Sequence, residues 1–210
     1  GGAPLFRLSA HACRVSASRR TGLALQFLSA QLDQLYARLT VMRLRAQGCQ
    51  PGRGLRVRGG VPYLRNPGSL VIGNNVRLRN EPTRIRLATV PQGAIILGDE
   101  VSLNTGVHIF SAARIDVGGG SRIGDNVAMF DTSFHPVHEG RSVRPRPITI
   151  GRNVWIGRNA IILPGVSIGD HSVVAAGSVV FDDIPARQVW RGNPAAFVKH
   201  VRATDDFRRS

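Results

Sequence analysis

Residues 150–185 read IGRNVWIGRNAIILPGVSIGDHSVVAAGSVVFDDIP, and an aliphatic residue returns at every sixth position of this stretch. The aliphatic series is Ile150, Ile156, Ile162, Ile168, Val174 and Val180. A six-residue period is typical of a parallel β-helix, in which each hexapeptide contributes a short strand and a corner. Three hexapeptides close one coil, so this stretch predicts two stacked coils with the aliphatic residues pointing inward.

The same period occurs earlier in the chain in a different frame. Its aliphatic series is Leu97, Leu103, Ile109 and Ile115, then, after a two-residue slip, Val117, Ile123 and Met129. Ile72, Val76 and Leu78 indicate a frayed first coil, and the segment 81–92 breaks the frame as an excursion would. Recurrent Gly and abundant Val and Ile argue against helices here. We therefore expect an all-β domain over residues 69–188, followed by a tail over 189–210.

The N-terminal region has a different pattern. Residues 1–20, rich in Arg, Ser and Ala, predict a mobile basic arm. Residues 21–68 predict an amphipathic helix, capped at Thr21 and ended by Gly48, and then a turn-rich entry. The helix carries one apolar stripe, made of Leu25, Leu28, Leu32, Leu35, Leu39 and Met42. The stripe fits packing on the β-domain, association with other subunits, or a membrane surface; packing against protein is favoured.

Composition sets wider limits on partners and compartment. The net charge of +15 attracts anions, such as nucleic acid, acidic lipid or a polyphosphate cofactor, although abundant Arg is also compatible with no dedicated polyanion. No basic motif interleaved with aromatics is present, which disfavours nucleic acid. Cys13 and Cys49 lack zinc or disulfide-framework spacing. No apolar run reaches the roughly 20 residues of a membrane span, and polar Gln26 argues against a signal sequence, so we expect a cytoplasmic protein.

The interruption of the repeat predicts the functional loop. After Phe134 the six-residue frame resumes only at Ile150, so residues 135–149 must leave the β-helix. The loop opens with His135, Pro136, Val137 and His138. Histidine is the commonest general base near neutral pH, which makes His135 the candidate base. The alternative is that His135 only hydrogen-bonds a loop carbonyl.

Three segments carry a resemblance to a known family over roughly Leu70 to Val201. They are DTSFHPVH at 131–138, the stretch 150–185, and GNPAAFVK at 192–199. Together they resemble the hexapeptide-repeat acyltransferases, in the branch of galactoside, maltose and nodulation-factor O-acetyltransferases. The N-terminal region is similar to that of envelope-glycan acetyltransferases. The resemblance implies a left-handed parallel β-helix, acetyl-CoA as co-substrate without a metal, and a homotrimer with active sites between subunits.

The resemblance also implies site residues. His135 matches the family's base, and Asp131 is placed to orient its imidazole or hold the acceptor. The remaining acceptor candidates are Asn104, Arg141 and Trp155. The family aspartate expected near Asn104 is replaced by Ala112.

For the donor, the resemblance implies that acetyl-CoA is bound by Trp155, Gly157, Arg158, Ala176, Arg191 and Lys199. The backbone N–H of Arg158 is the candidate oxyanion contact. Ala176 corresponds to a pantetheine contact, and Arg191 and Lys199 are placed for the phosphates. Phe181 and Asp182 depart from the family pattern, so the phosphate contacts differ in detail.

The sequence therefore predicts an O-acetyltransferase that modifies a carbohydrate hydroxyl. Its expected acceptor is a cell-envelope polysaccharide or a lipid-linked or nucleotide-sugar precursor, at the inner face of the cytoplasmic membrane, with residues 21–47 as a candidate membrane contact. An amino-sugar N-acetyltransferase is the nearest alternative. Two others are a zinc carbonic-anhydrase-like enzyme using His108, His135 and His138, and a basic module that binds nucleic acid or anionic membrane.

Overall fold

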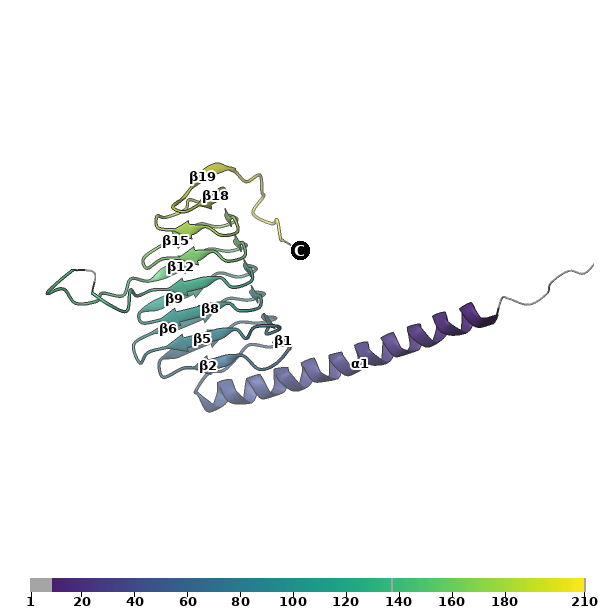
Figure 1. The fold of residues 1–210 in the computed structure, drawn as a ribbon. Coiled ribbons are helices and arrows are strands. Elements are labelled where there is room, and N and C mark those ends of the chain that lie inside the picture. The colour runs from purple at the N-terminus through teal and green to yellow at the C-terminus, as the bar shows by residue number, and fades with distance from the viewer. Residues whose placement is uncertain (1–8, 137, 210) are drawn as a thin grey trace, which may run out of the picture.

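The computed structural model of the protein describes residues 9–136 and 138–209. It is a parallel β-helix whose stacked coils stand on the end of one long helix (Figure 1). Each full coil contributes one strand to each of three sheets, and successive coils pair in parallel. The parallel β-helix expected from the six-residue period is confirmed.

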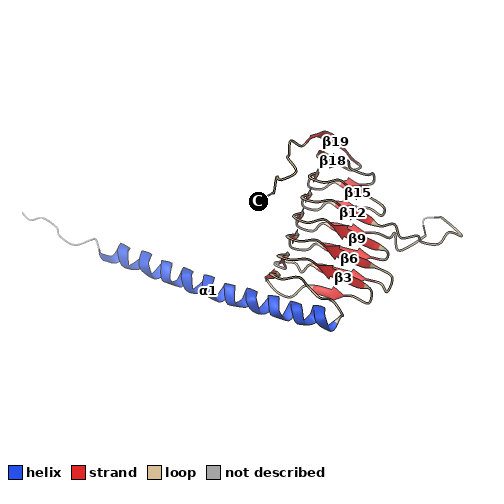
Figure 2. Ribbon diagram, turned by 180° about the vertical axis from the view of Figure 1, so that it is seen from behind, coloured by secondary structure: helices blue, strands red, loops and turns tan. Residues whose placement is uncertain are grey.

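The three sheets, here called A, B and C, run along the length of the β-helix. Figure 2 shows the strands of sheet C stacked one above the other. Sheet A contains β1 (Arg56–Arg58), β4 (Arg77–Arg79), β7 (Ser102–Leu103), β10 (Arg122–Ile123), β13 (Trp155–Ile156), β16 (Val173–Val174), β18 (Gln188–Gly192) and β19 (Ala195–His200). Sheet B contains β2 (Tyr63–Arg65), β5 (Arg86–Thr89), β8 (His108–Ser111), β11 (Ala128–Phe130), β14 (Ile161–Ile162) and β17 (Val179–Val180). Sheet C contains β3 (Ser69–Ile72), β6 (Ala94–Leu97), β9 (Arg114–Val117), β12 (Ile148–Ile150) and β15 (Ser167–Ile168).

The core consists of ladders of aliphatic side chains, one rung per coil. In sheet A the strand register stacks Val57, Leu78, Leu103, Ile123, Ile156 and Val174. All six are buried, as are the other aliphatic residues of both predicted frames. Burial of apolar surface is the main driving force for folding. Because a strand needs only one or two inward side chains to be held in the core, each strand is short and is followed directly by a corner.

The first coil starts earlier than expected. Residues 56–65 already form β1 and β2, so the segment predicted as a turn-rich entry belongs to the β-helix. Each of these strands has one buried residue, Val57 or Leu64, between outward polar or aromatic ones, which hides the repeat in the sequence. The expected excursion over 81–92 is likewise wrong for residues 86–89, because β5 pairs normally with β2 and β8.

The C-terminal tail is structured. β18 continues sheet A and then turns back as β19, the antiparallel pair that ends the sheet. Residues after β19 fold along the β-helix: the Arg209 N–H donates to Asn153 Oδ1 at 3.1 Å, and its guanidinium donates to the His171 carbonyl at 2.7 Å.

Helix α1 spans Ser9–Ala46, so it begins twelve residues before the predicted Thr21 cap. Ala, Arg and Ser dominate residues 9–20, and the first two are good helix formers, which accounts for the longer helix. The predicted mobile arm is therefore wrong for residues 9–20, while residues 1–8 lie outside the described part of the chain. The end of the helix agrees with the prediction, because Gly48 has a φ of 76° and the Cys49 N–H donates to the Leu44 carbonyl at 2.9 Å.

The face of α1 that packs on the β-helix is different from the predicted stripe. Thr40 and Leu44 are buried, and Tyr36 and Ala37 pack against the core. The described part of the stripe is 39–65% exposed and consists of Leu28, Leu32, Leu35, Leu39 and Met42. Packing of this stripe on the protein's own β-domain is therefore wrong. Among the described residues, no helix combines the length and apolarity needed to cross a membrane.

Candidate active site

The loop predicted from the break in the repeat leaves the β-helix between β11 and β12 and projects from its side (Figure 1). The loop starts at Asp131, directly after β11, and Ile148 and Thr149 of the predicted loop belong to β12 instead. The two ends of the loop are joined: the Asp131 carbonyl accepts a hydrogen bond from the Arg146 N–H at 2.7 Å. The two ends of the loop therefore lie together, and the residues between them extend outward.

The carboxylate of Asp131 is fully buried and points to the preceding coil. Its oxygens accept hydrogen bonds from the Ser111 hydroxyl at 2.7 Å and from the N–H groups of Ala112 at 2.7 Å and Ala113 at 2.9 Å. Among the described residues, Asp131 makes no hydrogen bond or ion pair with His135. Asp131 thus fastens the root of the loop, and the sequence reasoning that set it beside the imidazole did not foresee this role.

His135 is exposed on the loop, and its backbone is held by two hydrogen bonds with Ser133. Its N–H donates to the Ser133 carbonyl at 2.7 Å, and the Ser133 hydroxyl donates to the His135 carbonyl at 2.8 Å. The imidazole itself has no hydrogen-bond partner in the described part of the chain. An exposed imidazole on a fastened backbone is available to accept a proton from a bound hydroxyl.

An aromatic cluster on the outer face of sheet B supports the residue before His135. The Phe134 ring centroid lies 4.9 Å from that of Phe110 and 5.8 Å from that of Phe130, and the Phe130 ring meets His108 edge-on at 4.9 Å. Burial, aided by the nearby Arg86 charge, lowers the pKa of His108, so it is neutral at pH 7. Sequence reasoning missed this cluster, although aromatic residues at outward positions of the repeat were a visible signal.

The other predicted acceptor residues do not all lie near His135 in the chain. Arg141 lies in the same loop, where it lines a cavity of about 230 Å³ with Ser133 and His138. Asn104 and Trp155 belong to sheet A: Asn104 follows β7, and Trp155 lies between Arg122 and Val173 on the outer face.

Three of the predicted donor residues, Gly157, Arg158 and Ala176, lie at the corner between sheets A and B, here called the A–B corner. The coils pack closely there, since a Cβ on Gly157 would lie 2.5 Å from the Ala176 nitrogen. The N–H groups of Arg158 and Ala176 have no acceptor among the described residues. The Arg158 side chain turns to Asp125, with 3.5 Å between Nε and Oδ2.

The corner between sheets C and A, the C–A corner, provides an internal comparison. The segment Ile-Gly-Arg-Asn occurs at 150–153 and again at 156–159. In the first copy the Arg152 N–H donates to Asp170 Oδ1 at 2.7 Å. The equivalent Arg158 N–H in the second copy is open, so the A–B corner offers backbone donors to an external carbonyl.

Arg191 and Lys199 are exposed on the hairpin β18–β19, which lies beyond the last coils of the β-helix. Their charges are available to phosphate groups near that end of the molecule. Among the described residues, no group of three or more His, Cys, Asp or Glu side chains is arranged to hold a metal within one protomer.

Stacked hexapeptide coils interrupted by one histidine-bearing loop are the arrangement of the hexapeptide-repeat acyltransferases, and this chain belongs to that family. The family model described as bacterial transferase hexapeptide (six repeats) matches residues 147–182. The chain is 32% identical over 149 residues to WbbJ of Escherichia coli, which is named as a lipopolysaccharide biosynthesis O-acetyl transferase. The aligned region covers 65% of this chain and 74% of WbbJ. Family membership agrees with the left-handed winding expected from the resemblance.

The galactoside O-acetyltransferase of Escherichia coli is 37% identical over 115 residues, covering 53% of this chain and only 56% of that enzyme. Two solved structures share the fold. One is a hexapeptide-repeat acetyltransferase of Vibrio cholerae (TM-score 0.55, 24% identity, 86% of this chain and 94% of that one). The other is a variant of AntD, an N-acyltransferase of Bacillus cereus (TM-score 0.66, 20% identity, 77% and 89%).

Proposed function

We propose that the protein is an acetyl-CoA-dependent O-acetyltransferase of a carbohydrate hydroxyl. The observation that carries this proposal is the histidine loop, which interrupts the repeat between β11 and β12. Asp131 binds the start of the loop to the preceding coil, and the exposed His135 follows Phe134 of the aromatic cluster. The expected acceptor is an envelope polysaccharide or its lipid-linked or nucleotide-sugar precursor. The similarity to WbbJ supports that choice.

In the proposed reaction His135 takes the proton of the acceptor hydroxyl while that oxygen attacks the acetyl carbonyl carbon. Acetyl-CoA supplies the activated acetyl group as a thioester. The Arg158 N–H donates a hydrogen bond to the carbonyl oxygen as negative charge develops on it, and the neighbouring Ala176 N–H is free to bind the pantetheine chain. The proton held by His135 passes to the departing thiolate, which restores the neutral imidazole.

Residues from two protomers complete the site in this proposal. His135 lies in the loop that connects sheets B and C, whereas Trp155 belongs to sheet A and Arg158 to the A–B corner. Apolar side chains that point outward from the β-helix and its loop, including Phe134, Ile161 and Phe181, are exposed, which supports their burial between subunits. We infer a homotrimer, and light scattering that gave a monomer would contradict it.

Contact with the inner face of the cytoplasmic membrane is part of the same proposal. The exposed Leu stripe of α1 is flanked by Arg38 and Arg43, a pattern that suits an anionic lipid surface. The same two arginines would face each other in a parallel coiled coil of α1 helices, which disfavours that use of the stripe.

The test is acetyl-CoA consumption across a panel of neutral sugars, amino sugars, nucleotide sugars and lipid-linked glycans. We expect one acceptor class to react through a hydroxyl, and the His135→Ala variant to lose roughly 10²–10⁴-fold in rate. His138→Ala is the matched control and should retain most of the activity. Acetylation only at nitrogen would favour the N-acetyltransferase alternative, and an unaffected His135→Ala variant would remove the proposed base.

The shared site has its own test. His135→Ala and Trp155→Ala chains, each defective alone, should regain activity when they are unfolded and refolded together, because some interfaces then receive both native residues.

The two alternatives outside acyl transfer are addressed by zinc analysis of the purified protein, and by nucleic-acid and vesicle binding measured at rising salt.

A further inference from the structure

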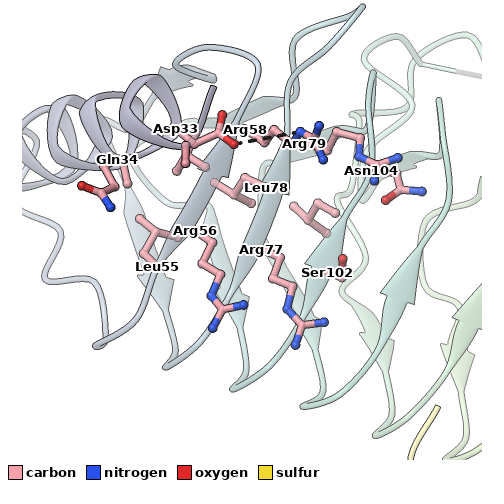
Figure 3. Close-up of a pocket in the computed structure, with 14 residues that line it drawn as sticks. Asp33, Gln34, Leu55, Arg56, Arg58, Arg77, Leu78, Arg79, Ser102 and Asn104 are labelled. Atoms are coloured by element: carbon pink, nitrogen blue, oxygen red, sulfur yellow. Dashed lines mark ion pairs between the residues drawn. The ribbon is translucent and has the colours of Figure 1, made fainter. Parts of the chain in front are cut away.

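A groove of about 420 Å³ lies where α1 runs past the outer face of sheet A (Figure 3). One wall is α1 around Asp33 and Gln34, and the other is formed by outward side chains of β1, β4 and β7. It lies at the first coils, whereas the open N–H groups of Arg158 and Ala176 belong to later coils of the A–B corner. The groove is thus separate from the proposed donor site.

Four arginines line this groove as two stacked pairs, one on each side of it (Figure 3). The parallel register of β1 and β4 sets Arg56 beside Arg77 and Arg58 beside Arg79, and all four are exposed. Figure 3 shows Arg56 and Arg77 extended alongside each other. Neighbouring strands are about 4.8 Å apart, and like charges at that spacing repel. The arrangement costs stability unless an anion lies between the guanidinium groups.

The protein itself supplies little compensating charge. Arg58 is near Asp33 at 3.9 Å and Glu81 at 3.4 Å. Asp33 is the one acidic residue among the groove's lining residues. Arg56, Arg77 and Arg79 have no acidic partner in the described part of the chain, which leaves three guanidinium groups available at one groove.

Neutral hydrogen-bonding groups continue the stack. Ser102 is the register partner of Arg77, and Asn104 lies one residue beyond Leu103, which pairs with Leu78. Asn104 is therefore the neighbour of Arg79, as Figure 3 shows. Hydroxyl and amide groups next to guanidinium groups can bind sugar hydroxyls beside a phosphate.

We propose that this groove binds the phosphate or diphosphate group of a phosphorylated sugar. Arg56, Arg77 and Arg79 hold the phosphate oxygens, and Ser102 and Asn104 face the sugar. Only the statement that this ligand is the acceptor rests on the proposed function. Binding of a phosphate in the groove does not, because binding can be measured without acetyl transfer. The phosphate can belong to a soluble nucleotide sugar or to a lipid headgroup.

Calorimetry with inorganic pyrophosphate and with UDP-glucose tests the groove directly. The Arg77→Gln/Arg79→Gln variant should bind at least about tenfold more weakly, because two charge-assisted contacts to the phosphate are lost. The matched control is Arg65→Gln/Arg84→Gln, which removes the same charge from exposed arginines outside the groove. Its affinity should stay within about twofold, since only the general field changes.

Two further measurements guard against misfolding. Pyrophosphate should raise the Tm of the parent and the control but not that of the groove variant. Arg77→Lys/Arg79→Lys keeps the charge but loses bidentate geometry, so it should bind with intermediate affinity. If all variants bound equally, or if the control lost as much as the groove variant, no specific site would exist.

The source of the phosphate is decided by sedimentation with phosphatidylcholine vesicles with and without phosphatidylglycerol. Affinity for UDP-glucose without groove-dependent vesicle binding assigns a soluble ligand, and the reverse assigns a lipid headgroup. Absence of binding to every probe would overturn the site. If the groove variant lost as much affinity for CoA as for pyrophosphate, the groove would be part of the donor site and not a separate one. If the groove bound no phosphate but the protein acetylated an unphosphorylated sugar in a His135-dependent reaction, the proposed function would stand without this site.

Discussion

The carboxylate of Asp131 accepts a hydrogen bond of 2.7 Å from the hydroxyl of Ser111, which belongs to the preceding coil. The N–H groups of Ala112 and Ala113 donate to the same carboxylate, so one buried side chain joins the root of the histidine loop to the β-helix. Buried donors that lose their acceptor keep the full cost of desolvation. The loop therefore depends on Asp131 for its position as much as on its own residues.

Replacing this carboxylate should loosen the loop and destabilise the protein. We expect Asp131→Ala to lower the free energy of unfolding in urea by about 3 kcal/mol, since three donors lose their partner. Trypsin should then cut faster at the Arg141–Ser142 bond in the loop. Asp182→Ala is the control, because Asp182 is exposed and makes no hydrogen bond or ion pair among the described residues. Equal unfolding curves for all three proteins would show that Asp131 is no anchor.

The second prediction concerns the ring of Phe134, which is 50% exposed and has a φ of 62°. A bulky residue rarely adopts this φ, so its two ring contacts, each worth about 1 kcal/mol, hold an otherwise unfavourable backbone. Phe134→Ala should lower the rate of acetyl transfer roughly tenfold through a less ordered His135, with little change in global stability. Tyr63→Ala removes an equally exposed ring elsewhere on sheet B and should leave the rate unchanged.

The sequence predicted the regions where each strand leaves a clear aliphatic signal. Every aliphatic residue from Leu97 to Val180 that the repeat identified is buried, because a six-residue frame leaves it no other orientation. The first coil escaped prediction because Val57 and Leu64 are single inward residues among arginines. The face of α1 was misjudged for a related reason: Thr40 and Tyr36 pack on the β-helix, while the more apolar stripe remains exposed.

The histidine loop was predictable because it interrupts a period, which marks its position in the sequence. The contacts of Asp131, the aromatic cluster and the arginine groove were not, since each joins residues about 20 positions apart that meet only through stacking of coils. The groove depends in addition on the direction in which α1 leaves the first coil, which no local pattern specifies.

The third prediction is a loss of stability in mild acid that involves His171. Its ring is buried, and the Asn153 amide donates to Nδ1 at 2.9 Å while also donating to the Phe207 carbonyl at 2.8 Å. The ring must therefore be neutral at Nδ1. Burial lowers its pKa below 6.5; the Arg187 and Arg209 charges act in the same direction and the Asp170 and Asp205 charges oppose it.

Because the folded pKa is the lower one, the unfolded chain binds more protons as the pH falls through 6.5. Stability should therefore be complete above that pH and decline below it, with release of the residues after β19. Unfolding free energies measured from pH 8 to pH 5 test the slope. His171→Asn should reduce the slope, and Asn tolerates the positive φ of 62°. His108→Phe should remove the part of the slope due to His108, whose pKa is also lowered. An unchanged slope in both variants would exclude these groups as its cause.

The fourth prediction separates close packing from donor binding at two corners of the same coil. A Cβ on Gly157 would lie 2.5 Å from the Ala176 nitrogen, and a Cβ on Gly151 would lie 2.4 Å from Asp170 Oδ1. Both alanine variants should lose about 1–3 kcal/mol of stability, because neighbouring coils must move apart. Only Gly157→Ala displaces the open N–H groups of Arg158 and Ala176, so only this variant should bind CoA about tenfold more weakly in calorimetry. If Gly151→Ala weakened CoA binding to the same extent, the effect would come from general loosening of the β-helix, and the A–B corner would lose its support as the donor site.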